Sequence, residues 1–354
     1  MPKDNIISDI EIKTHNIEIE KGLIKSMKTY FKNLLPICCR RIFKCMWYSF
    51  QLMPEYVYWF WRDLWYSSLI RDKKSQLAEL LVTSHVLEKG ITMPQRRAGF
   101  GYERVRTVIR RCKEAINSYT ENHIEIQSAL KDLEQYLQIH EMDKFTLPED
   151  ISDGIKSLLK YKKSDTVSCF ESTPDDFFKE TKNFYEFAHL RHTCRWFSGM
   201  PVDKAILIKV IKLAQTAPSA CNRQSSKVYV IDSEDKKSQV LKLQTGNRGF
   251  GYRADKILLI TADMRFWNFK TRTSAYLDAG IFTMNLLYAL HYYKICACTL
   301  NAHLTSTQKN QLHRIVGYSD SEMPIVFIAI GKACDHFMIA GSQRLNTEQI
   351  YSFV

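Results

Sequence analysis

Two arginines and a polar turn mark the part of the chain best suited to hold a ligand. Arg191 and Arg195 stand four residues apart, and a guanidinium group can bind phosphate through two parallel hydrogen bonds. One amphipathic helix separates them from the polar turn at residues 218–224 (PSACNRQ). The amides of Asn222 and Gln224 suit the polar edge of a planar ring. Residues 191–224 therefore predict a cradle for a phosphorylated, planar ligand.

Other residues that could bind a ligand or act in catalysis give weaker signals. Arg344 is a third candidate for phosphate contact, although isolated arginines are usually solvated surface charges. His303 follows a predicted strand and could donate a proton, but a lone histidine there is more often a surface residue. His85 and Glu88 stand three apart like half of a two-metal site, without a second such pair nearby. We therefore predict no metal site and assign no catalytic side chain.

Composition narrows the class of protein and of partner. The chain has 354 residues, of which 45% are hydrophobic and 25% charged, which is typical of a globular protein of one or two domains. Its formal net charge of +12 predicts an anionic partner: nucleic acid, an anionic membrane surface or a phosphorylated cofactor. The basic residues at 104–113 lack interleaved stacking aromatics, so we expect a solvated helix face and no nucleic-acid partner. The ten cysteines lack zinc-site spacing, which favours free thiols in the cytoplasm.

The secondary structure predicted for the chain differs between its N-terminal and C-terminal parts. Residues 1–145 are predicted to be helical, and residues 146–183 form a linker or peripheral wrap rich in Lys, Ser and Asp. In residues 184–354, apolar runs of strand length alternate with helical patterns. Regular crossovers are few, so we predict an α+β fold with a mixed sheet flanked by helices. The expected helices are 69–87, 102–119, 124–139, 202–215, 278–293 and 306–316, with Ser306 as an N-cap and residues 349–353 as helix or strand; the expected strands are 227–231, 257–262, 295–300 and 325–330.

One aromatic stretch in the N-terminal half has the character of a membrane-surface helix. Residues 45–61 (CMWYSFQLMPEYVYWFW) are interrupted by Pro54 and Glu55 and fall short of the roughly 20 residues that a spanning helix needs. Arg40, Arg41 and Lys44 precede the stretch, as in helices that lie at a lipid interface. The alternative is that these side chains pack on the protein's own core.

The C-terminal half resembles the FMN-dependent nitroreductase family. That family begins with an Arg-Arg-Ser-x-Arg-x-Phe run and a Pro-Val helix entry, followed by a Pro-Ser-x-x-Asn-x-Gln turn. An Asp-Ala-Gly helix, a strand ending in Gly and a late arginine complete its pattern. Here these features stand, in the same order, as residues 191–197 (RHTCRWF), Pro201-Val202, residues 218–224, Asp278-Ala279-Gly280, Gly331 and Arg344. The shared order makes the joint signal stronger than any single motif. Two departures are His192 at the second arginine and Ser225-Ser226 where Pro-Trp is usual.

The resemblance implies an intertwined homodimer with FMN in each of two interface clefts. By position, Arg191 and Arg195 with Arg344 would hold the phosphate and ribityl chain, and Thr193 would replace the family serine. Pro218, Ser219 and Asn222 would line the ring, with Asn222 and Gln224 as polar contacts. A backbone N–H of Leu300-Asn301 would lie near flavin N5. The full predicted cofactor-binding set is Arg191, His192, Thr193, Arg195, Pro218, Ser219, Asn222, Gln224, Leu300, Asn301 and Arg344.

The implied activity is that of an FMN-dependent NAD(P)H oxidoreductase. NADH or NADPH would reduce the flavin and a small-molecule acceptor would reoxidise it, in ping-pong hydride transfer. Residues 85–101 also resemble nitroreductase-like proteins of polysaccharide gene clusters, which indicates a role in polysaccharide biosynthesis. The alternative is a catalytically weak flavin-binding or assembly module whose helical N-terminal region docks a partner or a membrane surface. Both readings place the protein in the cytoplasm, with peripheral membrane contact through the aromatic stretch as an option.

Overall fold

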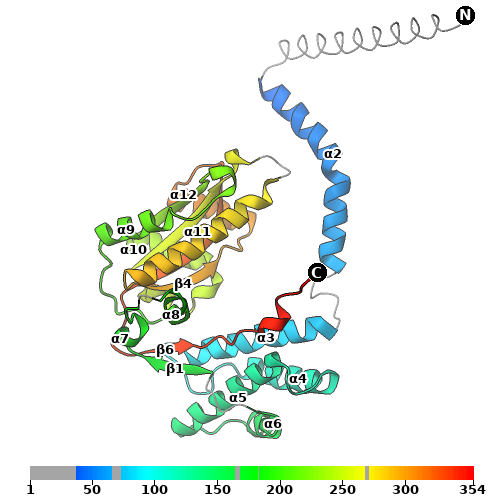
Figure 1. Cartoon of the computed structure of the whole chain (residues 1–354), viewed down its shortest axis with the longest axis vertical. Coiled ribbons are helices and arrows are strands. Elements are labelled where there is room, and N and C mark those ends of the chain that lie inside the picture. Colours follow the sequence, from blue (N-terminus) through cyan, green and yellow to red (C-terminus); the bar gives the residue numbers. More distant parts are fainter. Residues whose placement is uncertain (1–36, 66–72, 164–167, 182, 268–270) are drawn as a thin grey trace, which may run out of the picture. The chain divides into compact units, whose positions relative to one another are not determined.

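The computed structural model describes residues 37–65, 73–163, 168–181, 183–267 and 271–354 (Figure 1). The chain divides into two compact units, Met1–Asp72 and Lys73–Val354. The boundaries predicted at 145/146 and 183/184 fall inside the second unit, and they stay a prediction.

The described part of the first unit is one long helix, α2 (Ile37–Trp65). The sequence predicted a break at Pro54, which is wrong, because the helix continues through this residue. Proline removes one backbone hydrogen bond, and the turns on either side keep theirs. Bulky side chains along α2 are exposed, among them Phe43, Trp47 and Phe50. None of the helices in the described ranges is long and apolar enough to cross a bilayer.

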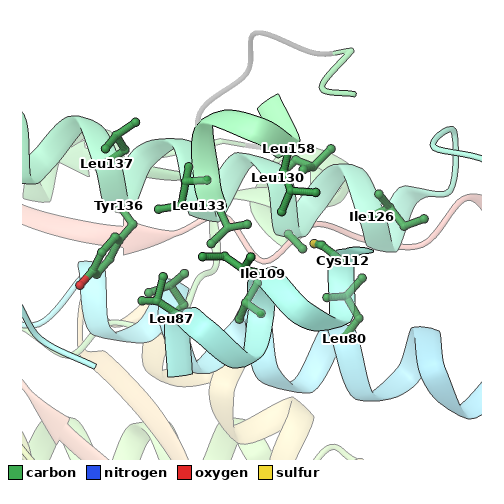
Figure 2. Packing of buried hydrophobic residues seen from close by; sticks show 14 of the residues in the cluster. Leu80, Leu87, Ile109, Cys112, Ile126, Leu130, Leu133, Tyr136, Leu137 and Leu158 are labelled. Atoms are coloured by element: carbon green, nitrogen blue, oxygen red, sulfur yellow. The ribbon is translucent and has the colours of Figure 1, made fainter. Parts of the chain in front are cut away.

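Four helices open the second unit and enclose a core of their own. They are α3 (Lys73–Ile91), α4 (Tyr102–Ser118), α5 (Ile124–Met142) and α6 (Glu149–Leu159). Figure 2 shows their apolar side chains interlocking, with Leu80 and Leu87 of α3 facing Leu130 and Leu133 of α5. The predicted helices at 102–119 and 124–139 are confirmed. Helix α6 lies where the sequence predicted a linker or wrap, and its Ile151, Ile155 and Leu158 are buried.

A four-stranded antiparallel sheet forms the centre of the C-terminal part. Its strands are β2 (Ser226–Ile231), β3 (Lys256–Asp263), β5 (Glu322–Gly331) and β4 (Cys296–Asn301), in that spatial order. Alternate residues of β3 point to opposite faces, as strand geometry requires. Leu258 and Ile260 pack with α9 (Lys204–Ala214) and α11 (Thr273–Tyr292), whereas Ile257 and Leu259 pack with α10 (Glu234–Leu243) and α12 (Ser306–Val316). The predicted α+β class and the four predicted strands are confirmed, but all the strand pairs of this sheet are antiparallel, so it is not the mixed sheet that was expected.

A second, two-stranded sheet joins the start and the end of this part of the chain. β1 (Cys169–Ser172) pairs antiparallel with β6 (Phe337–Ala340). Two short helices, α7 (Pro174–Phe177) and α8 (Phe184–Leu190), then lead to Arg191. The sequence did not reveal β1 or β6, because four-residue strands are too short to display alternation. Their pairing places residues 342–344, which follow β6, beside the helical region.

The start of α12 and the last residues of the chain differ from the prediction. The N-cap of α12 is Thr305 and not Ser306; its hydroxyl accepts from the backbone N–H of Gln308, whose side chain bonds back to Thr305. This reciprocal pair is the capping box, which Ser306 is one position too late to form. After β6 the chain forms only a short 3₁₀ helix, η6 (Thr347–Gln349), so the segment predicted at 349–353 has no helix or strand beyond Gln349.

Candidate ligand-binding site

The segment that carries the predicted arginines is fixed against the central sheet. The backbone N–H of Cys194 donates to Ala297 O of β4 at 3.0 Å, and Phe197 forms a bridge with Ala333. The side chains of Cys194 and Phe197 are buried in the core on this side of the sheet. The core thus holds the backbone that presents Arg191, Thr193 and Arg195.

Arg191 and Arg344 form a cationic group, and His192 lies beside it. Burial, together with the charge of Arg344, lowers the pKa of Arg191, while Tyr288 acts in the opposite sense. Burial, Arg191 and Arg344 lower the pKa of His192. The Arg191 Nε is buried and has no hydrogen-bond partner among the described residues. A buried guanidinium nitrogen without a partner is costly, so this group suits an oxyanion.

His291 lies beneath this group and was missed in the sequence. It lies in the last turn of α11, is buried, and contacts the rings of Phe177, Phe178 and Phe187. Burial, followed by the charges of Arg191 and His192, lowers the pKa of His291 to about 4. No sequence signal distinguishes it, because a histidine in the last turn of an apolar helix commonly satisfies the helix terminus.

Helix α3 holds the backbone that leads to Arg344. The N–H of Ser342 donates to Glu88 Oε1 at 2.7 Å, and the other oxygen of Glu88 lies 2.9 Å from His85 Nδ1. Ser342 adopts a left-handed φ of 50°, which is uncommon for a residue with a side chain. The pair His85 and Glu88, which resembles half of a metal site in the sequence, therefore anchors the segment that presents Arg344.

Arg195 belongs to a second cationic group, with Lys89 of α3. Arg195 is 7% exposed, and its buried Nε has no partner among the described residues. Its guanidinium carbon lies 6.0 Å from the centre of the Phe250 ring, and Lys89 Nζ lies 5.3 Å from the same centre. Burial, then the charge of Arg195, lowers the pKa of Lys89. The sequence did not single out Lys89 as a site residue.

The polar turn holds strained backbone. Cys221, Asn222 and Gln224 have φ values of 51°, 53° and 48°, each of which costs on the order of 1–3 kcal/mol for a residue other than glycine. The Gln224 N–H donates to Ser219 Oγ at 3.0 Å, and Gln224 Nε2 donates to Asn222 Oδ1 at 2.9 Å. Such strain in an exposed turn is a pointer to function.

A buried carboxylate fixes this turn from below. Asp278, the first residue of the Asp-Ala-Gly motif, accepts from the Ala220 N–H at 3.0 Å and is buried. Pro218 and Asn222 are exposed above it. No hydrogen bond, ion pair or ring contact between described residues joins the turn to Arg191 or Arg195.

Leu300 and Asn301 close β4. Leu300 is buried and Asn301 is exposed. The carbonyl of Asn301 accepts from Gln244 Nε2 at 3.1 Å, and its side-chain oxygen accepts from the His303 N–H at 3.0 Å. Gln244 is thus a further residue that the sequence did not suggest, and it ties this strand end to the loop at residues 245–250.

The predicted residues therefore fall into four places. The structure brings together Arg191, His192 and Arg344, and it places Arg195 with Lys89. The turn at 218–224 and the end of β4 form the other two places. Thr193 is half-buried between the two arginines of its segment.

The part of the chain that holds both arginines and the polar turn matches a known family. Residues 189–246 match the model of the Nitroreductase family. Leu300, Asn301, Arg344 and Lys89 lie outside the matched segment. No curated protein matches the chain.

Several solved structures are similar to part of the chain. A proposed NADH dehydrogenase/NAD(P)H nitroreductase from Parabacteroides distasonis is 17% identical; the likeness covers 49% of this chain and 98% of that chain, with a TM-score of 0.43. A nitroreductase family protein from Streptococcus pneumoniae is 19% identical, with 49% and 100% covered and a TM-score of 0.41. An FMN-dependent nitroreductase from Clostridium difficile is 18% identical, with 47% and 92% covered and a TM-score of 0.38.

Proposed function

We propose that the protein is an FMN-dependent oxidoreductase that takes electrons from NADH or NADPH and passes them to a small-molecule acceptor. The single observation that supports this most is the coincidence of two features in one segment. Residues 189–246 match the Nitroreductase family, and the same segment holds Arg191 and Arg195 with buried, unpartnered guanidinium nitrogens. The resemblance of residues 85–101 suggests an acceptor from polysaccharide or cell-envelope synthesis.

The residues present fit an anionic, aromatic cofactor. Arg191 and Arg344 are the residues we assign to the phosphate, since their mutual repulsion would be relieved by an oxyanion between them. Asn222 and Gln224 supply amides for the polar edge of the ring, with Pro218 and Ser219 beside it. FMN, when bound, would supply the hydride chemistry in ping-pong turnover. The chain's own residues bind and orient it, and none of them is required as a proton donor.

We also propose that the functional form is a homodimer. Helix α11 exposes an apolar stripe at helical spacing that includes Leu277, Ile281 and Met284. A contiguous exposed apolar face on a folded unit is typical of a protein interface. A partner seated there would also complete a cleft to which the turn and the arginine groups both contribute. Sedimentation equilibrium should give twice the chain mass, and a monomer at micromolar concentration would contradict this proposal.

The experiment for the cofactor is to identify what the purified protein carries. The full chain is purified, denatured, and its released small molecules are separated alongside FMN, FAD and riboflavin standards. We expect FMN, or uptake of added FMN at about one per chain. Release of FAD would contradict the cofactor assignment, and a protein that carries and takes up no flavin would contradict the proposed function.

A second candidate function is a flavin-binding or assembly module at a membrane surface. The observation that favours it is the exposed face of α2, where Phe43, Trp47 and Phe50 are 71%, 60% and 82% exposed. Arg41 and Lys44 are exposed on the same helix. An aromatic face beside basic side chains suits an anionic lipid interface. In this reading FMN would bind but no nicotinamide would reduce it.

A further inference from the structure

The last turn of α3 places a cation beside Arg195, although α3 lies outside the segment that matches the Nitroreductase family. Lys89 Nζ and the Arg195 guanidinium each approach the Phe250 ring, which is fully buried. The two cations lie close enough together that the charge of Arg195 lowers the pKa of Lys89. The two like charges are therefore gathered at one place in a partly buried environment.

The described contacts do not neutralise these charges. Neither Lys89 nor Arg195 forms a salt bridge with a carboxylate in the described part of the chain, and the Arg195 Nε is buried without a partner. Lys89 donates one hydrogen bond, to Gly246 O at 2.6 Å, whereas an ammonium group has three protons to donate. A cation over an aromatic face gains only about 0.5–2 kcal/mol. Partly buried cations normally have an anionic partner, which leaves room for one supplied by a ligand.

Several contacts fix the backbone around Lys89, so its position is not accidental. Trp196 Nε1 donates to Thr92 O at 2.8 Å, which ties the end of α3 to the arginine segment. A Cβ added at Gly249 would lie 3.3 Å from the Met93 sulfur, so the loop packs closely on this end of α3. Glu88 at the preceding position holds Ser342. The cation is thus preorganised before any ligand arrives.

We propose that Lys89 and Arg195 form an anion subsite of the ligand-binding site, separate from the Arg191–Arg344 group. Lys89 and Arg195 share the Phe250 ring, whereas the neighbouring cation of Arg191 is Arg344. The helical region at residues 73–159 thereby contributes a ligand-binding residue, Lys89 of α3, to the site. The subsite takes an electron-rich oxygen, either of a phosphate group or of the carbonyl edge of the flavin ring. Its assignment to the cofactor rests on the function proposed above.

The test measures ligand binding by the full chain and by three variants. Lys89→Gln removes the charge, Lys89→Arg restores it, and Lys113→Gln removes an exposed charge from α4 as the matched control. The probes are FMN, riboflavin and inorganic phosphate. FMN and riboflavin binding are followed by flavin fluorescence, and phosphate binding by the rise in the unfolding midpoint.

We expect Lys89→Gln to raise the Kd for FMN by about tenfold or more, because one charge-assisted hydrogen bond is lost. Lys89→Arg and Lys113→Gln should stay near wild type. A loss with FMN alone places the cofactor phosphate in the subsite, and an equal loss with riboflavin places the ring edge there. Equal FMN and riboflavin affinity in Lys89→Gln and Lys113→Gln would overturn the proposal.

The phosphate arm separates this proposal from the function on which it rests. If the wild type binds no flavin, the oxidoreductase proposal fails; phosphate stabilisation that Lys89→Gln alone loses would still support the subsite. Absence of any phosphate effect in such a protein would overturn the subsite as well. If Lys89→Gln does not fold, Arg195→Gln replaces it, with the same expected losses.

Discussion

At the scale of single residues, the site is defined by cations held close together. Burial, and after it the charge of Arg344, lowers the pKa of Arg191; burial, Arg191 and Arg344 lower the pKa of His192. Cations held this close repel one another, and a bound oxyanion offsets that repulsion. The same logic applies to Lys89 and Arg195.

We predict that Arg344→Gln weakens FMN binding by about 10- to 100-fold, because a hydrogen bond to a charged group contributes about 1.5–3 kcal/mol. The effect should be smaller for riboflavin, which has no phosphate. Arg314→Gln, an exposed arginine on α12, is the matched control. Equal losses with FMN and riboflavin, measured by fluorescence titration, would place Arg344 away from the phosphate.

His291 should make stability depend on pH. Its pKa falls from an ordinary 6.5 to about 4 in the folded protein, so protonation favours the unfolded state. The neutral side chain therefore contributes fully to the free energy of unfolding above about pH 6.5, and this contribution is lost as the pH falls toward 4. Since one pKa unit is worth about 1.4 kcal/mol, the loss is up to roughly 3 kcal/mol. Urea unfolding should show a shallower decline between these pH values for His291→Leu, and parallel curves would contradict the assignment.

At the scale of elements, the last turn of α3 organises both cationic groups. Lys89 joins Arg195, and Glu88 holds Ser342 two residues before Arg344. A helix outside the segment that matches the Nitroreductase family is therefore part of the site's architecture.

We expect Glu88→Ala to weaken FMN binding several-fold by releasing the backbone that presents Arg344. Removing the acceptor leaves the Ser342 N–H without its partner, which also costs about 1–3 kcal/mol of stability. Glu88→Gln keeps an acceptor oxygen and is the control. In an Arg344→Gln background the Glu88 substitution should have no further effect on affinity, and additive losses would show that Glu88 acts elsewhere.

The elements that the sequence predicted best are those with long, regular patterns. Helices α4 and α5 and strands β2 to β5 have enough periodic residues to identify them. β1 and β6 are too short, and the capping box at Thr305 lies one residue from the predicted N-cap. The site was harder to predict. Lys89 is 106 positions from Arg195 in sequence and meets it only through tertiary packing, which no local pattern reveals.

At the scale of the whole molecule, the candidate ligand-binding site is accompanied by two further surfaces that could bind partners. The apolar stripe of α11 suits a second copy of the chain, and α2 presents aromatic and basic side chains. These surfaces lie on different units, so their roles can be tested separately.

For α2 we predict binding to anionic lipid vesicles. Replacing Phe43, Trp47 and Phe50 together with Ser should abolish flotation with phosphatidylserine vesicles, because the apolar side chains that enter the interface are gone. FMN binding should be unchanged in the same protein. Triple replacement of the exposed Lys113, Glu114 and Asn117 on α4 with Ser is the control. Undiminished flotation of the α2 variant would exclude this face as the membrane contact.

The central claim is that the chain binds FMN and that a reduced nicotinamide reduces it. The direct measurement is an anaerobic titration of the FMN-loaded full chain with NADH and with NADPH, followed by the visible absorption of the flavin. We predict that at least one donor bleaches this band in proportion to the amount added and that an electron acceptor restores it. A band that neither donor changes would contradict the proposed oxidoreductase and favour the binding module.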